Sequence, residues 1–272
     1  MQWENLTAPD FAAAVKQTHG VCLLPLACIE KHGEHLPLGT DLFIGMEMAR
    51  RAAEIEPAIV FPPFYLTQIM EARHQPGTIA IGAHLMLRLL EAVCDEIGRN
   101  GLSKIILVVS HGGNRFLASF FLQSLLDTRK DYVVYLAQTF WDPGFIDLRD
   151  RVLESEFDQH GGEMETSMIL AAHPALVKMD QIKRMGTSDE RSGKRLGRLQ
   201  HLAGLQPGQE TPISWYANFP DHYAGDARPA TAEKGEQFLE HLVQRLVEGI
   251  KAVKADTVAP ALYQEFFGRI RQ

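Results

Sequence analysis

The segment Ile105–Val109 constrains the fold most, because its consecutive apolar side chains leave neither face of an extended strand for water. Such a run is typical of a central strand in a parallel sheet that helices cover on both sides. A second apolar run, residues 21–29, also predicts a buried strand. Residues 132–138 predict a further strand. Prolines interrupt the apolar run over residues 58–66, which therefore predicts an edge strand.

Helical patterns separate these strands. Apolar residues recur at helical spacing, or helix-start signals occur, over residues 8–18, 42–55, 83–99, 114–125, 163–172, 191–202 and 232–255. Residues 67–82 are rich in Gly, Pro and polar residues and predict a loop. Strands alternating with helices predict an α/β layered fold with a largely parallel sheet. No linker or repeat divides the chain, so we expect a single domain over residues 1–272.

Composition excludes several classes of function. The net charge of −7, with no dense block of Lys and Arg, argues against a nucleic-acid surface. No apolar run approaches the roughly 18 residues that a membrane span needs, and no signal peptide is visible. Cys22, Cys28 and Cys94 lack metal-site spacing and lie in apolar patterns, so we expect buried free thiols. A cytoplasmic protein without nucleic-acid or membrane partners is the expectation.

A cluster of carboxylates and imidazoles directly follows the first predicted strand. Glu30 and His32 lie two positions apart, which places both on one face of an extended backbone, and Asp41 follows shortly after. These ligand types suit Zn²⁺, Mn²⁺ or Fe²⁺. A solvated charged loop is the alternative for Glu30 and His32 taken alone. Asp41 also fits the start of a helix, where a carboxylate is stabilised by free backbone N–H groups.

Two further polar clusters are expected at the same edge of the sheet. His111 and two glycines follow the central strand, and residues 160–167 (HGGEMETS) open a helix. Open α/β sheets bind ligands at the carboxyl ends of their strands, so these clusters are expected to meet the first one there. The glycines belong to no phosphate-binding motif, and no G-x-S-x-G pentapeptide occurs. Nucleotide binding and serine-hydrolase chemistry are therefore disfavoured.

With these clusters in view, the chain resembles the creatininase (creatinine amidohydrolase) family. The resemblance lies in residues 30–41 (EKHGEHLPLGTD), residues 110–114 (SHGGN) and residues 160–167, and Trp141-Asp142 matches a Trp-Asp pair of that family. It implies a three-layer α/β/α fold, two divalent metal ions per chain (Zn, Mn or Fe) and a homo-oligomer, usually a hexamer. It also implies a small-molecule substrate.

The resemblance also implies roles for individual residues. Glu30 and His111 match ligands of one metal, His32 matches a ligand of the second, and Asp41 matches the ligand that bridges both. The glutamate that completes the second metal in creatininase falls on Gly113 here.

Two acidic residues of the third cluster are candidates to replace that glutamate. We expect Glu163 to be the ligand, with Glu165 as a supporting catalytic residue or the alternate ligand. His160 matches the proposed proton donor.

Positions that would contact the substrate match the family less well. Trp141, Gly112 and the loop around His74 are expected to shape the pocket. Creatininase has an aromatic residue at the position of Gly112 and a Trp-Asp pair where this chain has Glu156-Phe157, so creatinine is not the expected substrate.

The expected reaction is hydrolysis of an amide, cyclic amide or lactone-like bond by a hydroxide that forms at the dinuclear metal site. The alternatives are a hydrolase of a cyclic keto-sugar or formamide, a catalytically silent metal-binding oligomer, and a redox enzyme or isomerase with a single Fe²⁺ or Mn²⁺.

Overall fold

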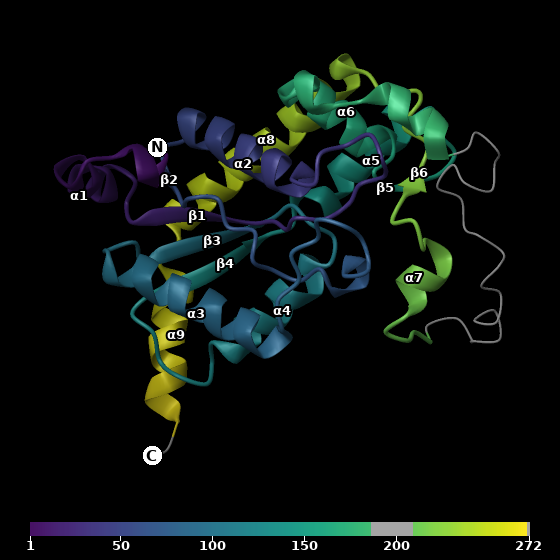
Figure 1. Cartoon of the computed structure of the whole chain (residues 1–272). Helices are drawn as coiled ribbons and strands as arrows, with labels where there is room; N and C mark the ends of the chain where they lie inside the picture. The colour runs from purple at the N-terminus through teal and green to yellow at the C-terminus, as the bar shows by residue number, and fades with distance from the viewer. Residues whose placement is uncertain (186–208, 271–272) are drawn as a thin grey trace.

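A four-stranded parallel sheet forms the centre of the molecule. The computed structural model describes residues 1–185 and 209–270 (Figure 1). The strands are β1 (Val21–Leu26), β2 (Ile59–Val60), β3 (Lys104–Val109) and β4 (Val133–Ala137). They lie in the order β2-β1-β3-β4, and every pairing is parallel. The predicted parallel sheet is confirmed.

The register of the two central strands fixes where the polar clusters lie. β1 pairs with β3 over its whole length, from Val21 beside Lys104 to Leu26 beside Val109. The two strands therefore end side by side. The chain segments that follow them, which carry Glu30 and His111, leave the sheet at the same edge.

Alternate side chains of the strands supply two separate cores. Val21, Leu23 and Ile106 pack with α2 (Thr40–Ile55) and α8 (Ala232–Ala255). Their neighbours in β1 and β3, which point the other way, pack with α3 (Ala83–Arg99) and α4 (Asn114–Ser124). Figure 1 shows these helix pairs on opposite faces of the sheet. The predicted α/β/α arrangement is confirmed.

Further elements surround this framework. They are η1 (Trp3–Asn5), α1 (Ala8–Gln17), η2 (Met70–Ala72), η3 (Thr139–Trp141), α5 (Pro143–Val152), β5 (Asp158–His160), α6 (Glu163–Ala172), η4 (Pro174–Leu176), η5 (Met179–Met185), α7 (Ser214–Asn218), β6 (Ala224–Gly225) and α9 (Val258–Arg269). No helix in the described part of the chain is both long and apolar enough to cross a membrane.

Some details differ from the prediction. The edge strand is only Ile59–Val60, because Pro62 and Pro63 follow and have no N–H to donate to a neighbouring strand. β5 pairs antiparallel with β6, and this small second sheet was not predicted. α5, α7 and α9 were not predicted either. The helix expected over residues 191–202 lies outside the described residues.

Candidate metal centre

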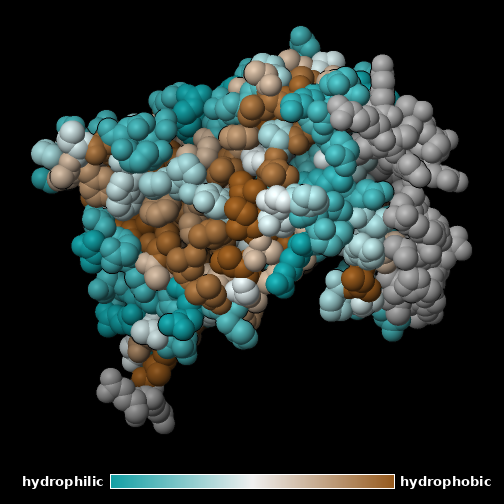
Figure 2. Space-filling view, viewed as in Figure 1, coloured by the Kyte–Doolittle hydropathy of each residue, from teal (hydrophilic) through white to brown (hydrophobic). Residues whose placement is uncertain are grey.

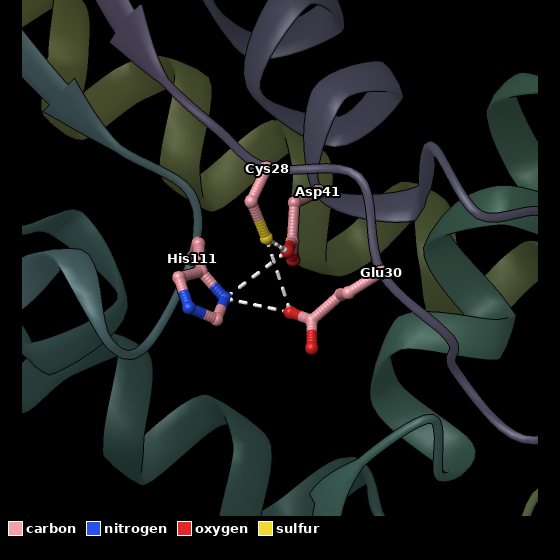
Figure 3. A group of neighbouring side chains, drawn as sticks. All are labelled: Cys28, Glu30, Asp41 and His111. Atoms are coloured by element: carbon pink, nitrogen blue, oxygen red, sulfur yellow. Dashed lines mark hydrogen bonds and ion pairs between the residues drawn. The ribbon is translucent and has the colours of Figure 1, made fainter. Parts of the chain in front are cut away.

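Three segments of the chain direct ligand-type side chains toward one point (Figure 3). Cys28 and Glu30 come from the irregular stretch after β1, Asp41 from the first turn of α2, and His111 from the loop after β3. Nδ1 of His111 lies 2.8 Å from Oε1 of Glu30 and 3.1 Å from Oδ2 of Asp41. Sγ of Cys28 lies 3.0 Å from Oδ2 of Asp41 and 3.2 Å from Oε1 of Glu30. All four side chains are buried.

His32 stands on the other side of Asp41. Its Nε2 lies 3.4 Å from Oδ1 of Asp41 and 3.8 Å from Oε2 of Glu165. Its Nδ1 lies 3.4 Å from the backbone carbonyl oxygen of Glu30, which can only accept, so the proton of the neutral ring belongs on Nδ1. Nε2 is buried and has no hydrogen-bond partner among the described residues. A buried ring nitrogen that faces two carboxylates and has no hydrogen-bond partner fits a site for a divalent cation.

The electrostatics of the cluster favour positive charge. Burial alone would lower the pKa of His32, but the carboxylates of Asp41 and Glu165 raise it to about 10. Burial likewise opposes ionisation of Glu30, yet the imidazoles of His111 and His160 bring the pKa of Glu30 well below its usual range. The carboxylates of Glu30 and Asp41 therefore stay ionised inside the protein and attract cationic groups, which is the property that a buried metal site requires.

Glu163 and Glu165 occupy different surroundings. The carboxylate of Glu163 is bound by Nζ of Lys234 at 2.5 Å and accepts hydrogen bonds from the backbone N–H groups of Glu154 and Ser155. Glu165 faces His32 and accepts a hydrogen bond from the N–H of Gly161 at 2.5 Å. The geometry thus places Glu165 beside the cluster, whereas Glu163, the expected ligand, is bound to Lys234. Burial raises the pKa of Glu165 to about 7.

His160 lies against the cluster from β5. Its ring stacks on that of His32 with 4.2 Å between centroids, and its Nε2 donates to the carbonyl oxygen of Lys31 at 2.8 Å. Because the carbonyl only accepts, Nδ1 is the ring nitrogen that carries the lone pair. Burial and the nearby His32 lower the pKa of His160 to about 3, so the ring is neutral at pH 7.

His222 also belongs to the site, although the sequence predicted no role for it. Its Nε2 contacts Oε2 of Glu30, and its Nδ1 accepts a hydrogen bond from Nε1–H of Trp215 at 3.0 Å. Trp215 lies in α7 and His222 in the segment between α7 and β6, and neither hydrophobic periodicity nor a metal-ligand spacing marks them. The one local signal is a histidine close to several aromatic residues.

His35 is buried as well. Its Nε2 lies 2.8 Å from Oγ1 of Thr166, so it faces the interior and not solvent.

A cavity of about 920 Å³ opens beside the cluster. Trp141 and Gly112 line it, as do Glu30, His111 and His160. A Cβ atom at Gly112 would meet nothing within 4 Å, so this glycine leaves space in the cavity. His74 does not line this cavity. Its Nε2 lies 2.9 Å from the carbonyl oxygen of Pro220, and it lines a separate cavity of about 520 Å³.

The chain is similar to several known proteins. The family model described as creatinine amidohydrolase matches residues 4–250. Creatinine amidohydrolase of Pseudomonas putida is 25% identical and covers 91% of this chain and 95% of its own length. Mycofactocin precursor peptide peptidase of Mycolicibacterium smegmatis is 28% identical, over 86% of this chain and 85% of its own. The 3-dehydro-scyllo-inosose hydrolase of Thermotoga maritima is 21% identical, over 93% of this chain and 85% of its own length.

The fold agrees with these relatives. A crystal structure of creatinine amidohydrolase superposes with a TM-score of 0.73 and 23% identity, over 94% of this chain and 98% of that chain. The predicted fold, family and enzyme class are thereby confirmed. The chain belongs to the creatininase (creatinine amidohydrolase) family of metal-dependent amidohydrolases.

Proposed function

We propose that this protein is a hydrolase with two divalent cations, one held by Glu30, Asp41 and His111 and the other by Asp41, His32 and Glu165. One observation carries this proposal. The two oxygens of Asp41 face different histidines, Oδ2 toward His111 at 3.1 Å and Oδ1 toward His32 at 3.4 Å. A carboxylate divided in this way between two imidazoles is suited to bridge a pair of cations.

The identity of the cations follows from the donor set. Two imidazole nitrogens with several carboxylate oxygens suit Zn²⁺, Mn²⁺ and Fe²⁺. Solved creatininases include a Zn–Zn form and a manganese form. We therefore propose Zn²⁺ or Mn²⁺ first and Fe²⁺ as the third choice.

Each part of the site has a distinct chemical role. When bound, such cations lower the pKa of a coordinated water from 15.7 toward about 7. His160 lines the cavity with a neutral ring whose Nδ1 carries the lone pair, so it can take up a proton there. In the protonated form, the ring could pass that proton to the leaving nitrogen or oxygen. His160 is therefore the proposed proton carrier.

The cavity indicates the kind of substrate. A volume of about 920 Å³ lies near the upper end of the range for small-molecule sites, and Trp141, Trp215 and Phe140 supply aromatic walls. An amide-bearing molecule larger than creatinine fits this space best. Relatives that act on a precursor peptide and on a cyclic keto-polyol support amide and ring-opening substrates alike. A keto-sugar or formamide hydrolase is the second candidate, and a catalytically silent metal-binding oligomer is the third.

A hydrolysis screen tests the reaction class. Metal-reconstituted protein is assayed against short peptides, cyclic amides, formamides and sugar lactones, with Glu30→Gln as the control. We expect turnover of at least one class by the wild type and its loss in the variant. Equal turnover by both proteins would place the chemistry elsewhere.

We further propose that the protein is a single domain over residues 1–272 and a homo-oligomer, with a hexamer as the working model. Apolar side chains gather across the middle of one face and again on α9 (Figure 2). Leu85 on α3 is 61% exposed and Leu262 on α9 is 57% exposed, values that suit subunit contacts. Light scattering of the purified protein measures the subunit count. The buried free cysteines support the proposed cytoplasmic location.

A further inference from the structure

The two carboxylate oxygens of Glu30 have separate partners. Oε1 faces Nδ1 of His111 and belongs to the proposed metal site. Oε2 contacts Nε2 of His222, a residue distant in the sequence that is 1% exposed. His160 stands farther off, with its Nε2 3.7 Å from the same oxygen. His222 is thus the principal partner of the Glu30 oxygen that turns away from His111.

Trp215 determines which nitrogen of His222 carries the proton. Its indole Nε1–H can only donate, and it lies 3.0 Å from Nδ1 of His222. Nδ1 must therefore accept, and the proton of the neutral ring lies on Nε2. There it is donated to Oε2 of Glu30. The indole thus donates to the imidazole, and the imidazole donates to the carboxylate.

The backbone of His222 is held in an unfavourable conformation. Its φ is +54°, in the left-handed region that residues other than glycine seldom adopt. The neighbouring structure maintains this geometry, because the N–H of His222 donates to Phe219 O at 2.9 Å and its carbonyl accepts from the N–H of Gly33 at 3.3 Å. The bond to Gly33 joins this turn to the segment that carries Glu30 and His32. Backbone strain of this kind is typical of functional sites.

We propose that His222 is a positioning residue for Glu30 and that Trp215 fixes the ring of His222 for that task. The inference rests on the proposed function, because the oxygen left to a cation is Oε1 of Glu30. Partners of this type around metal ligands change metal affinity about 10- to 100-fold when they are mutated. We expect effects of that size on the site formed by Glu30, Asp41 and His111.

Two substitutions of His222 separate its two contacts. The amide nitrogen of Gln reaches the position of Nε2, so His222→Gln keeps a donor for Glu30 and loses the acceptor for Trp215. The shorter Asn reaches only the position of Nδ1, so His222→Asn keeps the acceptor and loses the donor. Asn also tolerates positive φ, which preserves the turn. Trp215→Phe keeps an aromatic ring and removes the indole N–H.

The first measurement is Zn²⁺ affinity by chelator competition, with the Co²⁺ absorption spectrum as a second readout. We expect His222→Asn to weaken Zn²⁺ binding at the site of Glu30, Asp41 and His111 about 10- to 100-fold and to shift the Co²⁺ bands. His222→Gln is expected to stay within about threefold of the wild type, and Trp215→Phe to fall between the two. His241→Asn and Trp3→Phe, both remote from Glu30, are the matched controls.

The second measurement needs neither metal nor turnover. Long-range ¹H–¹⁵N NMR of histidine-labelled, metal-free protein reports the protonated nitrogen, and we expect Nε2–H with an unprotonated Nδ1 at His222. The opposite tautomer, or wild-type Zn²⁺ affinity in His222→Asn, would overturn the positioning role. Failure of the wild type itself to bind cations would instead contradict the proposed function.

Discussion

Nδ1 of His111 lies 2.8 Å from Oε1 of Glu30, although the two residues belong to different segments of the chain. The contact follows from the sheet, because Leu26 of β1 pairs with Val109 of β3 and each residue lies a few positions beyond its strand. The parallel core therefore positions the site. A change that shifted this register would separate the two side chains.

The two glutamates at the start of α6 are expected to behave differently when each is replaced by Gln. Glu165→Gln removes the carboxylate that faces His32, so we expect one metal equivalent fewer per chain by elemental analysis. Glu163→Gln is expected to keep the metal. It leaves Lys234 without its buried partner, and the free energy of unfolding should fall by about 3 kcal/mol in urea titrations. Loss of metal in Glu163→Gln alone would support the original expectation from the sequence.

Lys104 joins the sheet to the end of α8. Its Nζ donates to the carbonyl oxygens of Val253, Lys254 and Asp256 at 2.8, 2.9 and 2.7 Å. These carbonyls lie at or just beyond the negative end of the helix dipole. We expect Lys104→Met to lower the free energy of unfolding by about 1–3 kcal/mol. Lys251→Met, an exposed position on the same helix, is the matched control, and an equal loss in both would exclude this role.

Asp158 predicts a dependence of stability on pH. Burial raises the pKa of its carboxyl to about 6 from 3.8. Between about pH 4 and pH 6 the folded state holds a proton that the unfolded chain has released, so this group lowers stability as the pH rises. Asp158→Asn cannot ionise. The difference in free energy of unfolding between Asp158→Asn and the wild type should therefore shift in favour of the variant by about 3 kcal/mol from pH 4 to pH 6.

Thermal or urea unfolding of the metal-free proteins at several pH values measures this difference. Asp147→Asn, at an exposed position, is the control. A difference between Asp158→Asn and the wild type that stays constant from pH 4 to pH 6 would refute the prediction.

His160→Gln separates catalysis from metal binding. Gln keeps an N–H donor for the carbonyl oxygen of Lys31 but has no titratable nitrogen to carry a proton. On a substrate found in the screen we expect kcat to fall by about 10²- to 10⁴-fold with the metal content unchanged. An unaltered kcat would remove His160 from the reaction.

The sequence predicted the framework better than the details of the site. The apolar runs of β1 and β3 marked the central strands, and the polar residues after them could be assigned to one edge of the sheet. Periodicity also gave α8 its observed bounds, Ala232–Ala255. These features depend on local patterns that a single sequence contains.

Other parts depend on contacts between distant residues. Glu163 and Glu165 both fit the first turn of a helix, where any carboxylate is favoured. Only the position of Lys234, on another helix, shows which of them faces away from His32. His222 likewise reaches Glu30 through a turn with positive φ that no local motif announces. Tertiary packing decides such cases.

Metal content per chain tests the central claim most directly. Protein reconstituted with Zn²⁺ or Mn²⁺ and freed of excess ion is measured by elemental analysis, beside Glu30→Gln and Asp41→Asn. We expect two equivalents in the wild type, a loss of one in Glu30→Gln, and a loss of both in Asp41→Asn, whose carboxylate faces both histidines. A wild type that retains no metal, or variants that retain as much as the wild type, would contradict the proposed dinuclear site.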